Sequence, residues 1–113
     1  MVQYESSLSR TFAALSDPTR RSILDRLADG SATISELAEP AGMSLTGLKK
    51  HVRILEEANL VTTEKRGRVR HCHFEPKGFD EAGFWMEEFR RRQADRFDRL
   101  EQIIERKKAE RNE

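Results

Sequence analysis

Apolar residues recur at helical spacing near the N-terminus of the chain. Leu8, Phe12 and Leu15 are four and three positions apart, which places them on one face of a helix. A second helix is expected to start at Asp17-Pro18. The aspartate can accept hydrogen bonds from the free amides of the first turn, and proline has the fixed φ that suits this position. The apolar positions of this second helix are Ile23, Leu24 and Leu27.

Two further helices are predicted in the middle of the chain. Thr33 and Glu36 have the spacing of a capping box, in which each side chain accepts a hydrogen bond from the other residue's backbone amide. This third helix must be short, because Pro40 follows soon after its start. Ser44 is the expected cap of a fourth helix, over residues 44–58. The apolar positions of that helix are Leu48, Val52 and Leu55.

Beyond the fourth helix the hydrophobic period changes. Residues 60–63 and 69–74 are short runs of β-prone residues, and the segment between them contains Lys65-Arg66-Gly67-Arg68. Short strands on either side of a glycine-containing turn are typical of a β-hairpin. We therefore predict a two-stranded hairpin over residues 60–75 with a cationic tip.

The last third of the chain returns to a helical period. Apolar residues continue from Ala82 to Ile104, which predicts one helix over residues 77–108, with residues 109–113 frayed. A helix of about 30 residues is about 45 Å long, more than the rest of a small domain can cover. Part of its apolar stripe should therefore be exposed in a single chain.

The charge is distributed unevenly. The net charge of the whole chain is only +1, although 36% of its residues are charged. Residues 44–75 hold 7 basic and 4 acidic residues, whereas residues 76–113 hold 10 of each. A local excess of positive charge is the form that a nucleic-acid footprint takes, so the fourth helix and the hairpin are candidates for contact with phosphate.

Together these elements predict a mainly α (α+β) fold. Two helices joined by the turn at residues 40–43, with a cationic second helix and a cationic hairpin after it, are typical of a winged helix-turn-helix with a two-stranded wing and a long C-terminal helix. We expect one domain over residues 1–113, divided into a DNA-binding core at 1–76 and a dimerisation helix at 77–108.

The same residues resemble a known family. Residues 15–21, 34–61 and 67–76 are similar to the ArsR-type winged-helix transcriptional repressors, in the subgroup that lacks the metal-binding cysteines. The resemblance covers about residues 8–104. It places Thr33 and Ser35 where other members carry those cysteines, and the C-terminal helix has no histidine pair. We therefore expect no metal and no other cofactor.

The resemblance implies that the fourth helix is a recognition helix in duplex DNA. Leu45, Thr46 and Lys49 are placed to reach base edges, while Ser44, Lys50 and the wing arginines suit phosphates. The full predicted set of DNA contacts is Ser44, Leu45, Thr46, Gly47, Lys49, Lys50, His51, Arg53, Arg66, Arg68 and Arg70.

Two members of this set have a second interpretation. His51 could contact a phosphate or pack at the seam between the two helices of the helix-turn-helix. Gly47 could allow the backbone to approach DNA closely or have no such role, at a cost of about 1 kcal/mol relative to alanine.

The resemblance also implies a homodimer, which would set two recognition helices in successive major grooves of an inverted-repeat operator. The predicted dimer contacts are Leu8, Phe12, Trp85, Phe89, Phe97, Leu100 and Ile104. Alternatively, Trp85 could line an effector pocket. A small-molecule effector, not identified by the sequence, is a further possible partner.

The remaining patterns limit other functions. Cys72 is the one cysteine and lies between His71 and His73, but alternate residues of a strand face opposite ways, so we expect Cys72 to be a buried apolar residue. The chain carries no motif of a known enzyme class, no apolar run long enough for a membrane span and no signal peptide, so we expect a cytoplasmic regulator. The alternatives are a winged-helix module for protein or RNA, and a redox- or metal-gated DNA-binding sensor that uses Cys72.

Overall fold

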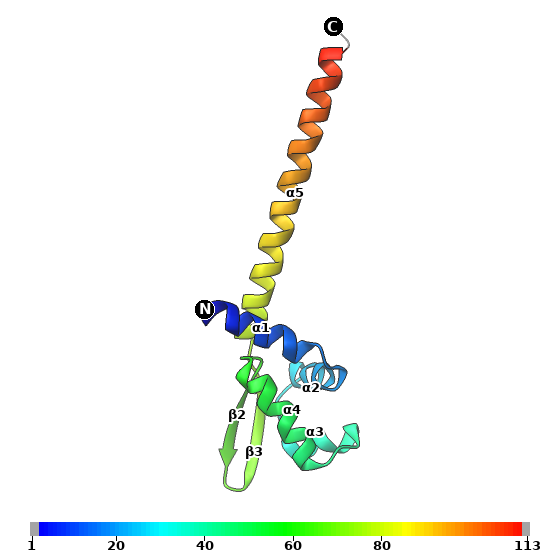
Figure 1. Cartoon of the computed structure of the whole chain (residues 1–113). Coiled ribbons are helices and arrows are strands. Elements are labelled where there is room, and N and C mark those ends of the chain that lie inside the picture. The colour runs from blue at the N-terminus through cyan, green and yellow to red at the C-terminus, as the bar shows by residue number, and fades with distance from the viewer. Residues whose placement is uncertain (1–2, 112–113) are drawn as a thin grey trace. The chain divides into compact units, whose positions relative to one another are not determined.

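The computed structural model describes residues 3–111, with side chains described from Ser6 onward. Helices predominate in this range, and one small sheet accompanies them (Figure 1). The elements are α1 (Gln3–Leu15), α2 (Pro18–Ala28), β1 (Ala32–Thr33), α3 (Ile34–Ala41), α4 (Leu45–Glu57), β2 (Val61–Arg66), β3 (Val69–Phe74) and α5 (Lys77–Arg111).

The predicted helix starts are confirmed. Asp17 accepts a hydrogen bond from the amide of Arg20 (3.0 Å), and Pro18 occupies the first turn of α2. Thr33 and Glu36 form both bonds of the capping box at the start of α3. These backbone hydrogen bonds to their carboxylates lower the pKa of Asp17 and of Glu36.

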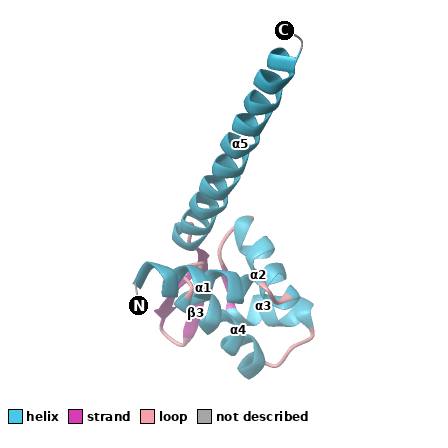
Figure 2. Cartoon of the chain, turned by 45° about the horizontal axis from the view of Figure 1, so that its top comes forward, coloured by secondary structure: helices cyan, strands magenta, loops and turns pink. Residues whose placement is uncertain are grey.

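The sheet has three strands, in the order β1-β3-β2, all antiparallel. Figure 2 draws the strands in magenta. The predicted two-stranded hairpin is present as β2 and β3, but the prediction missed β1. Ala32 and Thr33 pair with Cys72 and His71 on the outer edge of β3. A strand of two residues has no alternating pattern, so only the presence of β3 beside it identifies it.

The hydrophobic core combines the first four helices with the sheet. Leu48 and Leu55 of α4 are fully buried, as is Leu60 at the start of the hairpin. The predicted apolar positions of α2 are buried as well. The core is completed by small residues from neighbouring elements, namely Ala14, Ala32, Ala38 and Ala58.

The chain divides into two compact units after Ala82, rather than after residue 76 as the sequence predicted. The first turns of α5 belong to the first unit, because Gly78 and Ala82 are buried and Phe79 packs against the core. The second unit is the remainder of α5, a single helix (Figures 1 and 2). That helix is continuous to Arg111, and residues 112–113 lie outside the described range. The fraying of residues 109–113 stays a prediction.

Gly78 allows the first turn of α5 to lie close to the backbone of the loop that follows α4. Its amide donates to the carbonyl of Asn59 (2.9 Å), and a Cβ at this position would lie 2.5 Å from the carbonyl oxygen of Ala58. No real side chain tolerates that distance, and backbone atoms must move to relieve it.

Gly78→Ala should therefore lower the free energy of unfolding by about 1–3 kcal/mol, the usual cost of overpacking a well-packed site. Gly83→Ala in the same helix is the matched control, since a Cβ there meets nothing within 4 Å. The control should be neutral or gain up to about 1 kcal/mol from helix propensity. Urea unfolding of both variants measures this, and equal stability of the two would contradict the close approach.

Candidate nucleic-acid interface

A tight turn leads from α3 into α4. Gly42 ends α3 with φ of 63°, a left-handed conformation that glycine adopts without strain, and the amide of Met43 donates to the carbonyl of Ala38 (3.2 Å). Ser44 then caps α4, with its Oγ accepting from the amide of Gly47 (3.1 Å). No acidic residue lies in the first turn of α4, so its positive end stays available to an anion.

The two sides of α4 differ in burial. Its apolar side faces the core, and its other side exposes Lys49, Lys50 and Arg53. Arg53 forms an ion pair with Glu57 (3.3 Å), one turn further along the helix. In contrast, Lys49 and Lys50 have no hydrogen bond or ion pair to any residue that the structure describes. These two lysines are the cations of α4 that are free to meet an external anion.

Gly47 has a local reason to be glycine. It is half-buried, and a Cβ there would lie 3.2 Å from Ser44 Oγ and 3.3 Å from Met43 Cε. Both neighbours would have to give way by a few tenths of an ångström. The packing around Gly47 is therefore tight, and whether these two side-chain ends can shift decides the effect of a Cβ.

The wing closes through a two-residue loop, Gly67-Arg68, because Arg66 pairs with Val69. Gly67 has φ of 63°, which a two-residue hairpin of this kind requires at its first loop position. Arg66 forms two hydrogen bonds to Glu64 (3.1 and 3.2 Å), and this contact lowers the pKa of Glu64. Lys65 and Arg68 have no such partner within the described part of the chain.

Arg70 does not point freely away from the wing. Its Nη1 donates to Thr63 Oγ1 (2.9 Å), and the Thr63 hydroxyl in turn donates to Glu56 Oε2 of α4 (2.7 Å). This chain of hydrogen bonds connects both strands of the wing to the end of α4. Arg70 therefore helps to hold the β2–β3 hairpin against α4.

A groove of about 270 Å³ lies between the start of α3, α4 and the wing. Four cationic side chains line it, and none of its lining residues is acidic: the cations are Lys49, Lys65, Arg68 and Arg70. The DNA contacts predicted from the sequence do not include Lys65. The hairpin register could have included it, because Lys65 and Arg70 are direct partners across β2 and β3.

Comparisons with known proteins identify this arrangement. Residues 15–64 match a family model described as a helix-turn-helix domain. The chain is 30% identical over 82 residues to the transcriptional repressor SdpR of Bacillus subtilis (strain 168), and this match covers 73% of the chain and 91% of SdpR. A solved ArsR family transcriptional regulator shares 42% identity at a TM-score of 0.77, over 83% of this chain and 97% of that one.

The chain belongs to the ArsR family of transcriptional regulators. A further solved relative is the homodimeric winged helix-turn-helix DNA-binding domain of a possible ArsR-family regulator from Mycobacterium bovis. It is 27% identical, has a TM-score of 0.60, and the match covers 80% of each chain. The winged helix-turn-helix predicted from the sequence is thereby confirmed. No described helix is both long enough and apolar enough to cross a membrane.

Thr33 and Ser35, which the resemblance aligns with the metal cysteines of other family members, both carry hydroxyl side chains. Thr33 uses its Oγ1 to accept the amide of Glu36 (3.1 Å), so its hydroxyl forms part of the α3 cap. Ser35 is exposed beside the cationic groove. Nowhere in the described residues do three histidine, cysteine or carboxylate side chains gather in a way that could hold a metal ion.

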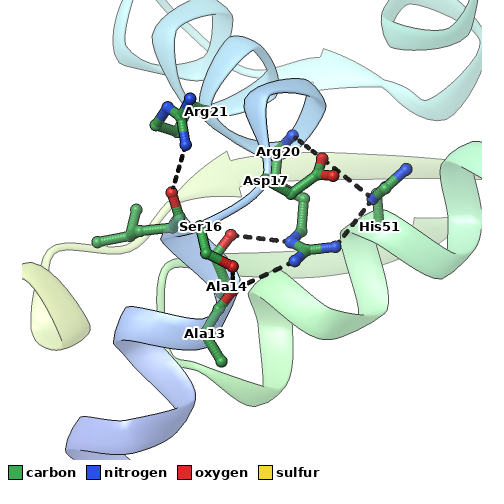
Figure 3. Close-up of polar contacts among 8 residues, drawn as sticks. Ala13, Ala14, Ser16, Asp17, Arg20, Arg21 and His51 are labelled. Atoms are coloured by element: carbon green, nitrogen blue, oxygen red, sulfur yellow. Dashed lines mark hydrogen bonds and ion pairs between the residues drawn. The ribbon is translucent and has the colours of Figure 1, made fainter.

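His51 lies at the seam between α4 and the start of α2 (Figure 3). Its Nδ1 is 3.2 Å from Arg20 Nη1 and 3.9 Å from Asp17 Oδ2, and its side chain is 21% exposed. On the helix it stands on the far side from Lys49, about 200° away at 100° per residue. This geometry favours the packing interpretation of His51.

Cys72 is fully buried, as predicted, while its neighbours His71 and His73 are half-buried on the other face of β3. Burial raises the pKa of the Cys72 thiol to about 11. His73 Nε2 is buried without a hydrogen bond and lies 3.8 Å from Glu64 Oε2. The thiol is thus kept protonated and shielded, which is the opposite of what a redox sensor needs.

Cys72 should accordingly react slowly with iodoacetamide at pH 7.5 in the folded protein, because both the thiolate fraction and access are small. In 8 M urea the reaction should accelerate by about two orders of magnitude or more, as the ordinary thiol pKa and full access return. Mass spectrometry over time measures both rates, with Cys72→Ala as the blank. Similar rates in buffer and urea would contradict the burial and revive the sensor alternative.

Proposed function

We propose that this chain is a homodimeric repressor that binds an inverted repeat in double-stranded DNA through α4 and the β2–β3 wing. The proposal is based on the exposed side of α4. This side presents Lys49 and Lys50, which have no partner among the described residues, next to a cationic groove and a helix start without acidic residues. Membership of a family of transcriptional regulators gives this surface its context. In this proposal the protein catalyses no reaction and acts in the cytoplasm.

Base recognition is assigned to the first turns of α4. Leu45 is 48% exposed, and Thr46 and Lys49 are exposed beside it. A helix of this kind enters the major groove with its N-terminal residues against base edges. Lys49 can donate to guanine, while Leu45 and the Thr46 methyl group suit a thymine methyl group.

Phosphate contact is assigned to Ser44, Lys50, Lys65 and Arg68. The last three are cations without a partner among the residues that the structure describes, and the hydroxyl of Ser44 can still donate while its oxygen serves as the cap. Arg53 and Arg66 were predicted in the same role, but each is paired with a glutamate. They would have to exchange that partner for DNA, so we expect each to contribute less.

Dimerisation is assigned to α1 and α5. Phe97, Leu100 and Ile104 are each at least half exposed, and Trp85 and Phe89 stack on each other at the surface of the helix. A regular row of large apolar side chains in water is typical of an interface. The homodimeric relative from Mycobacterium bovis supports a two-fold arrangement, which would present two copies of α4 to a palindromic site.

Lys49→Ala should reduce the preference for operator over random duplex by about 1–3 kcal/mol, since a base contact is lost. Arg68→Ala should weaken binding to both duplexes about equally and lower the salt slope by about one, as expected for a lost phosphate contact. Fluorescence anisotropy with the protein's own promoter fragment and a scrambled duplex, titrated from 50 to 200 mM salt, separates the two effects.

Two controls sharpen this experiment. Arg53→Ala should have a smaller effect than Arg68→Ala, because Arg53 is already paired with Glu57. Identical effects of the Lys49 and Arg68 variants on both duplexes would refute the assigned roles. A wild-type protein that binds single-stranded RNA or a protein partner and shows no promoter preference would refute the proposed function itself.

Leu100→Ser should weaken the dimer by about tenfold or more, because it removes a large apolar side chain from the proposed interface. Asp98→Ser is the matched control, since Asp98 lies about 200° around the helix from Leu100. Sedimentation equilibrium over a concentration series measures the dissociation constants. The same dimer affinity in both variants would exclude this side of α5 from the interface.

A further inference from the structure

One guanidinium group joins three helices in the DNA-binding unit (Figure 3). Arg20, in the first turn of α2, donates from Nε to the carbonyl of Ala14 (2.8 Å) and from Nη2 to that of Ala13 (3.2 Å). Both carbonyls lie in the last turn of α1, and that of Ala13 also accepts the amide and the hydroxyl of Ser16. The remaining nitrogen, Nη1, lies 3.2 Å from His51 Nδ1 on α4.

As a hydrogen bond, this contact depends on the tautomer of His51. A guanidinium has only donors, so a bond from Arg20 Nη1 requires Nδ1 to be the acceptor and the ring proton to be on Nε2. Asp17 completes the group: its Oδ2 accepts the amide of Arg20 and lies 3.9 Å from His51 Nδ1. Arg20 and Asp17 are the charged side chains that face this ring from the α1–α2 corner.

We propose that Arg20 is a positioning residue that ties the C-terminal end of α1 to the recognition helix α4 through His51. The effect of this link on DNA recognition rests on the proposed function, which assigns α1 to dimerisation and α4 to base recognition. Through Arg20, a displacement of α1 at the dimer interface is passed to the helix that contacts DNA. The contact to His51 is additional to the apolar packing of α4 and sets the rotation of the helix about its own axis.

The chemistry of arginine is needed for this role. The three bonds leave one rigid planar group in three directions, toward two carbonyls of α1 and one ring nitrogen of α4. A lysine ammonium is a single point from which the same three acceptors cannot all be reached in the same geometry. Arg20→Lys should therefore fold but lose the bond to His51.

Arg21 provides a matched control in the next position. Its Nη1 donates to the carbonyl of Leu15 (2.8 Å), so it too caps the end of α1, and it has no hydrogen bond to α4 within the described residues. Arg20→Gln and Arg21→Gln each remove one positive charge and bonds to the end of α1, two from Arg20 and one from Arg21. Only Arg20→Gln also removes the link to His51.

The first test needs no DNA. Amide hydrogen exchange of the full-length protein should be about tenfold faster in α4 of Arg20→Gln than in wild type, the size expected for one lost charge-assisted hydrogen bond. Arg21→Gln should change α1 but leave α4 within about twofold. Equal exchange of α4 in the two variants would overturn the proposal. A nitrogen NMR spectrum of the His51 ring in the wild-type protein is an independent check, because it needs no variant to fold. A neutral ring with its proton on Nδ1 would also overturn the proposal.

The second test measures DNA discrimination. Arg20→Lys and Arg20→Gln should lower the ratio of promoter to scrambled-duplex affinity by about tenfold, and Arg21→Gln should not. The effect should be absent when Arg20→Gln is added to His51→Leu, because the link is already broken. An undiminished effect in that double variant would overturn the positioning role. A wild type without promoter preference would instead refute the proposed function, while the exchange test would still decide the role of Arg20.

Discussion

The burial of one side of α4 is the constraint on which the rest of this molecule depends. Leu48, Val52 and Leu55 are at most 3% exposed and hold α4 against the helices and the sheet of the first unit. A helix buried along one stripe must expose the opposite one. The exposed stripe here carries the lysines, so the packing that stabilises the fold also presents the cationic surface.

Several contacts around α4 then set its geometry more finely than apolar packing can. The capping hydroxyl of Ser44 fixes where the helix starts, Glu56 connects its end to the wing through Thr63, and His51 connects its middle to α2. Apolar burial is non-directional, whereas hydrogen bonds depend on angle. This division suits a helix that must be both stably held and accurately aimed.

Internal ion pairs change which cations of the interface are available. The sequence shows an excess of basic over acidic residues between positions 44 and 75, yet Arg53 and Arg66 each have a glutamate within hydrogen-bond distance. Those surface pairs are weak, but they place carboxylates beside two of the predicted phosphate ligands. The cations without a partner among the described residues, Lys65 and Arg68 included, are therefore the ones free to meet an external anion.

The sequence by itself determined the local structure and the type of surface. Helix starts at Asp17, Thr33 and Ser44, the hairpin and the burial of Cys72 follow from capping chemistry and from short-range periodicity, which act between residues a few positions apart. Only the tertiary structure showed the strand β1, the boundary between the units after Ala82, the contact of His51 with Arg20 and the pairing of Arg70 with Thr63. Arg70 and Thr63 are seven positions apart, but the first three features depend on residues that are distant in sequence, and Arg20 reaches across 31 positions to His51. Local rules carry no information about such partners, because the partners become neighbours only when the core has formed.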